Sequence, residues 1–259
     1  MSTWSSRRKT LYLSSLFIII LAVVFSIFFI YFYKAPTCND GIMNGSEQGI
    51  DCGGACIKLC QSAYLPAVIS WGGGKFEKVA DGYYNVASYI VNPNTDAGAV
   101  NVPYKFALFD SKGVLIIERR GSISLPAHRN ALAFEPLVST GKRIPAKASF
   151  EFLAPPVWFK SHDTLDGLAI IDKAYSEDKT NSSLQITLEN RNIIAYNNLS
   201  IAAVLYDKDN NAIGFSKTTI DSIEPNNGQA VAPFTWPINR NGKVISIEPL
   251  PAIAPTLDK

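Results

Sequence analysis

Histidine is scarce in this sequence of 259 residues, which contains only His128 and His162. Neither histidine lies beside a cysteine or a serine in a nucleophile motif, and the G-x-S-x-G and H-E-x-x-H patterns are missing. The glycine-rich stretch Trp71–Lys75 lacks the Gly-Lys-Ser/Thr half of a phosphate loop, so it indicates a flexible turn. These absences argue against nucleophilic hydrolases, zinc proteases and nucleotide-binding enzymes, and we expect a protein without catalytic residues.

The chain also lacks a large excess of charge of either sign, because 24 Lys and Arg face 22 Asp and Glu. No acidic residue precedes residue 34, whereas Arg7, Arg8 and Lys9 cluster near the N-terminus. Without these three residues, 21 basic side chains face 22 acidic ones, so the remainder is near neutral. Since nucleic-acid binding depends on a basic surface, we expect no nucleic-acid partner.

Charged residues are absent from Leu11 to Tyr33, a run of 23 residues. As an α-helix this run would be roughly 34 Å long, enough to cross a hydrocarbon core of about 30 Å. The cluster Arg7–Lys9 precedes the run and only Lys34 follows it, so the positive-inside rule places the N-terminus in the cytoplasm. The sequence therefore predicts a cytoplasmic tail over residues 1–10, a transmembrane helix over 11–33 and an extracytoplasmic part over 35–259.

A cleaved signal peptide is the alternative for this apolar run. Signal peptides have an apolar region of about 7–15 residues that ends at an A-x-A-like cleavage site. Here the run is longer and leaves through "YFYKAPT", which lacks that pattern. We therefore expect a retained single-pass anchor in the cell membrane.

Amphipathic helices are missing after the apolar run, and the hydrophobic period is two. In one segment Leu184, Ile186 and Leu188 alternate with polar residues, as on a strand with one buried face and one solvated face. The pattern occurs twice, over residues 84–136 and 183–237. The matching landmarks are Asn92 and Asn190, Asp110 and Asp207, Pro126 and Pro225, and Phe134 and Phe234.

Each repeat has the length and the rhythm of strands that are typical of an Ig-like sandwich. The fold class that we predict is mainly β, with two tandem Ig-like antiparallel β-sandwiches over residues 62–156 and 157–259. One N-terminal transmembrane helix and a small disulfide-stapled segment would precede them. Proline-containing stretches around residues 64–75 and 150–167 would introduce the two modules.

A short motif in each repeat resembles the F-x-L-Y-D signature of a family of exported microbial β-sandwich domains. It reads Phe106-Ala-Leu-Phe-Asp110 in the first repeat and Ala203-Val-Leu-Tyr-Asp207 in the second. The resemblance implies a β-sandwich and a location in the cell envelope, and the family has no defined activity. We interpret Asp110 and Asp207 as structural residues that begin a turn by bonding to backbone amides.

Cysteine occurs only as Cys38, Cys52, Cys56 and Cys60. Outside the cytoplasm disulfides are the expected state, whereas structural zinc sites more often use paired C-x2-C motifs and redox centres use C-x-x-C. Four cysteines allow three pairings, and the sequence does not choose among them. We expect two disulfides that staple residues 34–61 into a rigid spacer.

Weak calcium binding is a second interpretation of the same segment. If Asp40 is position 1 of a twelve-residue loop like that of an EF-hand, Asn44 falls at position 5, and position 12 is Asp51 where an EF-hand has a bidentate Glu. Position 3 is Ile42, however, and no helix flanks the loop, so these residues would equally serve as turn formers. The string also resembles a C-x-D-G-I-x-N-G-x-E-x-x-x-D-C-G-G-x-C element of microbial surface proteins, which implies a stalk-like module without chemistry.

The leading hypothesis is a non-enzymatic, membrane-anchored surface protein whose sandwiches bind a protein or an envelope polymer. The first alternative is an accessory subunit of a membrane assembly such as a secretion or pilus machine. The apolar run lacks a G-x-x-x-G face, which favours a simple tether. A calcium-dependent adhesin is a further alternative.

Overall fold

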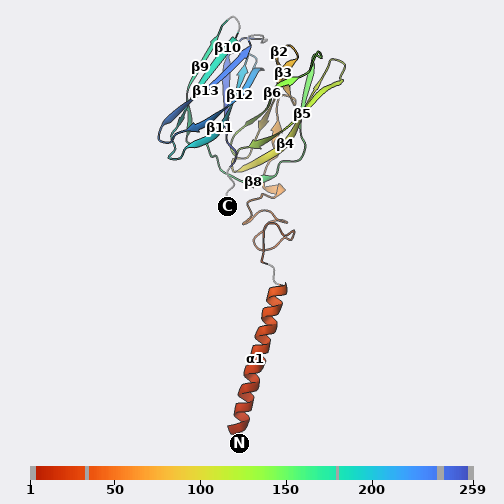
Figure 1. The fold of residues 1–259 in the computed structure, drawn as a ribbon, viewed down its shortest axis with the longest axis vertical. Helices are drawn as coiled ribbons and strands as arrows, with labels where there is room; N and C mark the ends of the chain where they lie inside the picture. Colours follow the sequence, from red (N-terminus) through yellow and green to blue (C-terminus); the bar gives the residue numbers. More distant parts are fainter. Residues whose placement is uncertain (1–3, 33–34, 179–180, 238–241, 256–259) are drawn as a thin grey trace. The chain divides into compact units, whose positions relative to one another are not determined.

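The computed structural model describes residues 4–32, 35–178, 181–237 and 242–255 (Figure 1). The chain divides into two compact units, Met1–Asp51 and Cys52–Lys259. Tyr33, which ends the predicted span, and Lys34, which begins the predicted spacer, lie outside the described residues, as do the first three residues of the predicted tail.

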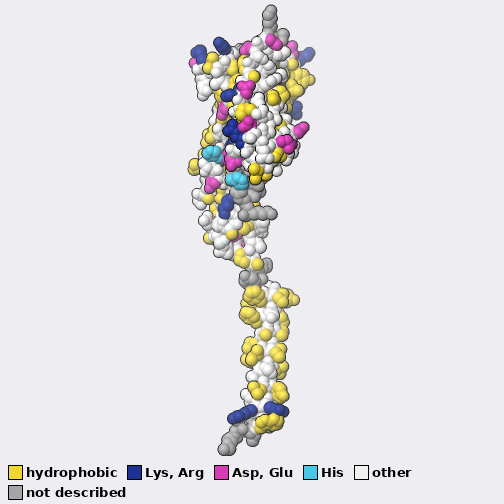
Figure 2. All heavy atoms as spheres, turned by 90° about the vertical axis from the view of Figure 1, so that its left-hand side faces the viewer, with side chains coloured by type: hydrophobic (Ala, Val, Ile, Leu, Met, Phe, Trp, Pro, Cys, Tyr) yellow, Lys and Arg dark blue, Asp and Glu magenta, His cyan; other side chains and the backbone are white. Residues whose placement is uncertain are grey.

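One helix, α1 (Trp4–Phe32), occupies most of the first unit and includes residues 11–32 of the predicted span. Its apolar side chains are exposed along its length, and Figure 2 shows them over the visible face of the helix. Residues Arg7–Phe32 are long and apolar enough to cross a membrane. A helix that is hydrophobic on all sides needs an apolar environment, so α1 is a membrane anchor or a signal sequence.

The second unit consists of short antiparallel strands and one 3-10 turn (η1, Gln61–Ala63). The strands of the first repeat are β1 (Val68–Ile69), β2 (Lys75–Ala80), β3 (Tyr83–Val91), β4 (Ala97–Phe109), β5 (Leu115–Leu125), β6 (Ala131–Ser139), β7 (Lys147–Phe152) and β8 (Trp158–Lys160). Those of the second repeat are β9 (Leu168–Glu177), β10 (Asn181–Asn190), β11 (Tyr196–Tyr206), β12 (Ala212–Ile223), β13 (Gly228–Pro237) and β14 (Ser246–Ala252).

The first repeat forms a sandwich of two sheets. In one sheet β3 pairs with β1 and β2 on one side and with β6 on the other. In the opposite sheet β4 pairs with β5 and with β7 and β8. Side chains from both sheets share one core, among them Val86, Phe106, Leu125, Phe150 and Trp158.

The second repeat forms a sandwich with the same order of strands. One sheet runs β9–β10–β13 and the other runs β12–β11–β14, around a core that includes Ile186, Ile201 and Trp236. The central strands β3 and β4 of the first sandwich therefore correspond to β10 and β11 of the second. The prediction of a mainly β fold with two antiparallel sandwiches behind one apolar helix is confirmed.

A third apolar cluster joins the two sandwiches. It contains Ala87, Tyr89 and Leu132 from β3 and β6, and Val204 and Phe215 from β11 and β12. On β11, Ile201, Ala203 and Leu205 face the core of the second sandwich, and Ala202 and Val204, which lie on the opposite face, are buried as well. Burial of both faces of β3 and β11 packs the two repeats against each other.

Polar bonds reinforce this interface. Tyr89 Oη donates to Glu248 Oε1 at 2.6 Å, and Tyr206 Oη donates to Glu248 Oε2 at 2.8 Å. At the connection between the repeats, Arg129 binds both carboxylate oxygens of Asp163, at 2.6 and 2.8 Å. A bidentate guanidinium–carboxylate pair has a defined geometry, so the turn before β6 is held against the linker.

Candidate functional site: a groove between the two sandwiches

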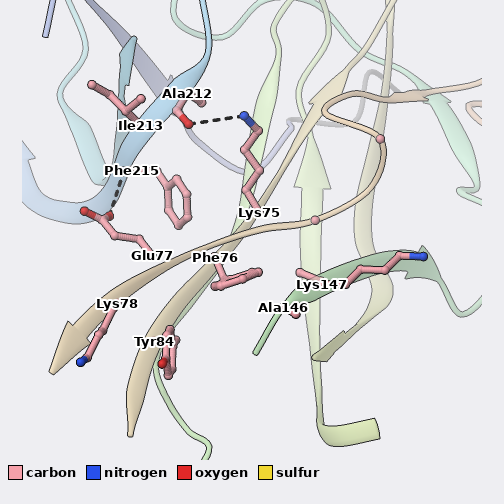
Figure 3. A pocket seen from close by; sticks show the side chains of 13 residues that line it. Lys75, Phe76, Glu77, Lys78, Tyr84, Ala146, Lys147, Ala212, Ile213 and Phe215 are labelled. Atoms are coloured by element: carbon pink, nitrogen blue, oxygen red, sulfur yellow. Dashed lines mark hydrogen bonds between the residues drawn. The ribbon is translucent and has the colours of Figure 1, made fainter. Parts of the chain in front are cut away.

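Three sheet edges surround a groove at the interface of the sandwiches. Residues of β2, β7 and β12, each an outer strand of its sheet, line the groove (Figure 3). An isolated bridge between Gly74 and Ala148 already joins the start of β2 to β7. The groove therefore combines side chains of outer strands from both repeats.

Two side chains of β2 cover part of the β12 edge. Lys75 Nζ donates to the carbonyl oxygen of Ala212 at 3.4 Å, and the amide of Phe215 donates to Glu77 Oε2 at 3.4 Å (Figure 3). Lys75 and Glu77 lie on the same side of β2 because strand side chains alternate with a period of two. Charged side chains on an edge strand discourage uncontrolled strand pairing, so this contact both joins the repeats and protects the edge.

The groove has a volume of about 620 Å³, within the roughly 300–1,000 Å³ range of ligand sites. Its charged lining residues are Lys75, Glu77, Lys78 and Lys147, so positive charge predominates. Aromatic rings of Phe76, Tyr84 and Phe215 supply the apolar part of the lining. Such a surface suits an extended ligand that carries negative charge and some apolar groups.

The two lysines of β2 differ in their electrostatic environment. Burial lowers the pKa of Lys75, although the negative charge of Asp207 partly opposes this effect. A hydrogen bond from Lys78 to Asp81, with an N–O distance of 2.7 Å, raises the pKa of the exposed Lys78. The two effects act in opposite directions, so burial disfavours the charged form of Lys75 and the hydrogen bond to Asp81 favours that of Lys78.

The loop before β2 adopts unusual backbone angles. Trp71 has φ of +60°, and Gly72 and Gly73 follow with φ of +68° and +118°. The carbonyl oxygen of Gly73 accepts a hydrogen bond from Ser88 Oγ at 2.6 Å. At Gly74 an added Cβ would lie 3.1 Å from Cβ of Ala148. The sequence stretch interpreted as a flexible turn is thus fixed by hydrogen bonding and by close backbone packing.

The cysteines form disulfides, as predicted. Cys52 is bonded to Cys60, with a Cα–Cα distance of 5.1 Å. Cys38 and Cys56 are disulfide-bonded as well, and none of the described cysteines is free. The sulfur atoms are therefore consumed by crosslinks, which leaves no thiolate for the zinc alternative.

The second half of the cysteine segment attaches to the first sandwich. The amide of Leu59 donates to the Trp158 carbonyl at 2.9 Å, and the amide of Lys160 donates to the Ile57 carbonyl at 2.8 Å. Lys160 Nζ also donates to the carbonyl of Gly54 at 2.5 Å. These bonds place the Cys52–Cys60 loop beside β8, so this part of the segment is continuous with the sandwich.

The residues suggested as calcium ligands lie in one loop of the first unit. Asp51 Oδ1 accepts from the amides of Asp40 and Gly41 at 2.9 and 3.1 Å. Asp40 accepts from the Ile42 amide at 2.9 Å and from Asn44 Nδ2 at 2.9 Å. Hydrogen bonds to the carboxylate lower the pKa of Asp40, the largest contribution coming from Asn44. A calcium ion would have to replace these bonds.

Asp110 and Asp207 occupy equivalent hairpin turns. Asp110 Oδ1 accepts from the amides of Lys112 and Val114 at 3.0 and 2.9 Å. Asp207 Oδ1 accepts from the amides of Asp209 and Asn211 at 2.9 and 2.8 Å. Each carboxylate bonds to the amides two and four positions ahead, the arrangement of a turn-forming Asp.

The two histidines are exposed and lie outside the groove lining. His128 has φ of +61° in the turn before β6, and His162 lies in the linker after β8. The groove residues were not foreseen from the sequence, because lysines on a short strand have the pattern of an ordinary solvated edge. The consecutive apolar residues Ala202–Tyr206 were the available signal for a second buried face.

No family model matches the chain, and no curated protein matches it. Among solved structures, red sea bream transglutaminase is 12% identical in sequence and has a TM-score of 0.20. The match covers 67% of this chain and 27% of the transglutaminase chain. A Bacteroides uniformis β-glucuronidase is 14% identical with coverages of 61% and 22% and a TM-score of 0.20. A β-glucuronidase of glycoside hydrolase family 2 is 10% identical with coverages of 81% and 25% and a TM-score of 0.22. The chain thus spans about a quarter of these enzymes, and similarity this distant carries no inference about activity.

Proposed function

We propose that this chain is a non-enzymatic, single-pass membrane protein that presents its two sandwiches outside the cytoplasm as one binding module. In this proposal α1 is retained as the anchor, the N-terminus is cytoplasmic and residues 35–259 are extracytoplasmic. The apolar helix preceded by Arg7–Lys9 and the disulfides after it support this topology. The two F-x-L-Y-D-like segments, at the ends of β4 and β11, support exported β-sandwich domains of that kind.

The groove between β2, β7 and β12 is the proposed binding surface. The observation that carries this proposal is that residues of both sandwiches build it, with Lys75, Lys78 and Lys147 around aromatic side chains. An anionic segment of an envelope protein or polymer fits this lining, because the positive charge of the lysines attracts it and the aromatic rings can contact its apolar groups.

Photo-crosslinking in native membranes tests the proposal. A benzoyl-phenylalanine at position 78 or at position 147 is expected to capture the same partner, whereas the same group at the exposed Lys208 is not. Capture of one protein in stoichiometric yield would support the accessory-subunit alternative within the same topology. Equal capture from all three positions, or no capture from the groove positions, would contradict the groove as the binding surface.

A charge-reversal pair isolates the electrostatic part. The double variant Lys78→Glu/Lys147→Glu is expected to lose partner capture. The matched control Lys208→Glu/Lys243→Glu, which changes the net charge equally at exposed positions outside the groove, retains it. The topology is tested separately by protease treatment of intact cells, which should degrade residues 35–259 and spare Met1–Lys9.

A further inference from the structure

A second hollow lies at the same interface and differs from the groove in its chemistry. Its volume is about 610 Å³, and its lining includes Trp71, Tyr89, Tyr206 and Glu248. Ser70 and Asn210 add polar groups at its border. Glu248 is the charged residue of this lining, so the hollow is negative where the groove is positive.

Glu248 carries a charge that no described cation pairs with. Each of its carboxylate oxygens accepts a hydrogen bond from one phenol, Tyr89 at 2.6 Å and Tyr206 at 2.8 Å. Within the described ranges Glu248 forms no salt bridge to lysine or arginine. Lys173 reaches the neighbouring residue, where its Nζ donates to the carbonyl of Ile247 at 3.3 Å. A half-buried carboxylate without a counter-ion is an attractive site for a cation.

The two phenols do not neutralise this charge. Burial raises the pKa of both Tyr89 and Tyr206, and the hydrogen bond to Glu248 raises each further. They are therefore neutral donors at physiological pH, and Asn130 Nδ2 fixes the Tyr89 hydroxyl from the other side at 2.8 Å. The carboxylate is held in place by neutral groups, so its negative charge is available to a ligand.

The third aromatic residue, Trp71, is brought to the hollow by a strained loop. A positive φ is uncommon for a bulky residue and strains the backbone, and Trp71 has φ of +60°. The Ser70 amide bonds to the Tyr89 carbonyl at 2.8 Å, and the Trp71 and Tyr89 ring centroids are 5.5 Å apart. Strained backbone concentrates at ligand sites. The Trp71 ring also lies 5.5 Å from Lys75 Nζ, and Lys75 lines the groove rather than the hollow.

We propose that this hollow binds an alkylammonium group, held by the rings of Trp71, Tyr89 and Tyr206 and by the carboxylate of Glu248. Aromatic faces attract organic cations, and tryptophan does so most strongly. A carboxylate beside such rings adds a direct charge interaction, whereas an anionic ligand would be repelled. The site is independent of the anionic partner proposed for the groove, and either proposal can fail without the other.

Titration of the full chain in lipid nanodiscs tests the proposal. The probes are choline, n-butylammonium and 3,3-dimethylbutanol, the last being a neutral molecule with nearly the shape of choline. Calorimetry and tryptophan fluorescence report binding, with sodium chloride matching the ionic strength. We expect both ammonium probes to bind and the neutral probe to bind at least tenfold more weakly. Tighter binding of choline would indicate that the natural ligand carries a methylated ammonium head group. Tighter binding of butylammonium would indicate a ligand with a lysine-like primary amine.

Variants assign the binding to the hollow. Glu248→Gln and Trp71→Leu are each expected to weaken choline or butylammonium binding at least tenfold. Glu151→Gln, which removes an exposed carboxylate elsewhere on the second unit, leaves it unchanged. Thermal unfolding shows whether each variant is folded. If a variant does not fold, the comparison of the ammonium probes with 3,3-dimethylbutanol on the wild-type chain still tests the proposal. Equal binding of 3,3-dimethylbutanol, unaltered binding by Glu248→Gln, or no binding of either ammonium probe would overturn the proposal.

Discussion

Asn92 and Asn190 make the same hydrogen bonds at equivalent positions of the two sandwiches. Asn92 Nδ2 donates to the carbonyls of Ala97 and Pro126 at 2.9 and 2.7 Å. Asn190 Nδ2 donates to the carbonyls of Ile194 and Ile223 at 2.8 and 3.1 Å. Both asparagines are buried, and each joins the end of one central strand to the connection that crosses between the sheets.

Removal of either asparagine should destabilise its sandwich. Asn92→Ala and Asn190→Ala each leave two carbonyl groups without their donor, and buried unsatisfied groups are costly. We expect each variant to lower the free energy of unfolding by roughly 2–4 kcal/mol. Urea unfolding of the full chain measures this. The control Asn197→Ala, at an exposed position of β11, should change stability by less than about 0.5 kcal/mol.

The tyrosines bound to Glu248 predict how stability depends on alkaline pH. Folding raises the pKa of Tyr89 and Tyr206 above the ordinary value of 10.0, through burial first and the Glu248 hydrogen bond second. The unfolded chain therefore loses these protons at lower pH than the folded chain. Their contribution to stability is complete below about pH 10 and is lost as the pH rises further.

Urea unfolding between pH 8 and pH 11 measures this dependence. The wild-type chain should lose stability above pH 10 more steeply than Tyr89→Phe/Tyr206→Phe, which lacks both titrating groups. Tyr12→Phe is the control, because that residue lies exposed on α1, in the first unit. Parallel pH profiles of the wild-type chain and the double variant would show that the two phenols are not coupled to folding.

Reduction of the disulfides should loosen the cysteine segment and leave the sandwiches intact. The Cys52–Cys60 bond closes a short loop with a sequence separation of 8, and a crosslink of this size contributes roughly 2–3 kcal/mol. Leu59 of this loop packs against the first core, but the buried residues of that core lie between Val86 and Trp158 and those of the second core lie further along the chain. Hydrogen exchange should therefore be faster in the presence of reductant than in its absence over residues 38–60. The exchange rates over β3, β4, β10 and β11 should be the same in both conditions. Faster exchange in those strands would contradict this separation.

The architecture was predictable because local sequence and tertiary packing agree. The alternation in Leu184–Leu188 and the acidic turns after Phe109 and Tyr206 each specify the same strands that the structure contains. The run of apolar residues Ala202–Tyr206 indicated a second buried face on β11, but the sequence did not show which strands of the first sandwich cover that face. The groove depends on that contact, so its residues could not be assembled from the sequence.

The cysteine segment shows a second limit. The spacing of the cysteines and the expected oxidising compartment predicted disulfides, but all three possible pairings were compatible with them. Only the path of the backbone in the structure shows that Cys52 pairs with Cys60. The same path directs Asp40 and Asp51 onto backbone amides, which the spacing of their carboxylates does not reveal. Carboxylates that form turns and carboxylates that bind calcium share one sequence pattern. They differ in whether their oxygens accept hydrogen bonds from backbone amides or coordinate an ion.

The central claim is that the two sandwiches are one rigid module, and a distance between them tests it most directly. Nitroxide labels at Lys112→Cys and Lys208→Cys place one probe on a hairpin of each sandwich, and the native cysteines are all in disulfides. Pulsed electron–electron double resonance on the full chain in nanodiscs should give one narrow distribution of the distance between the two labels. The variant Val204→Lys, which puts a charge into the buried interface, should broaden it. A broad distribution in the wild-type chain would contradict the account.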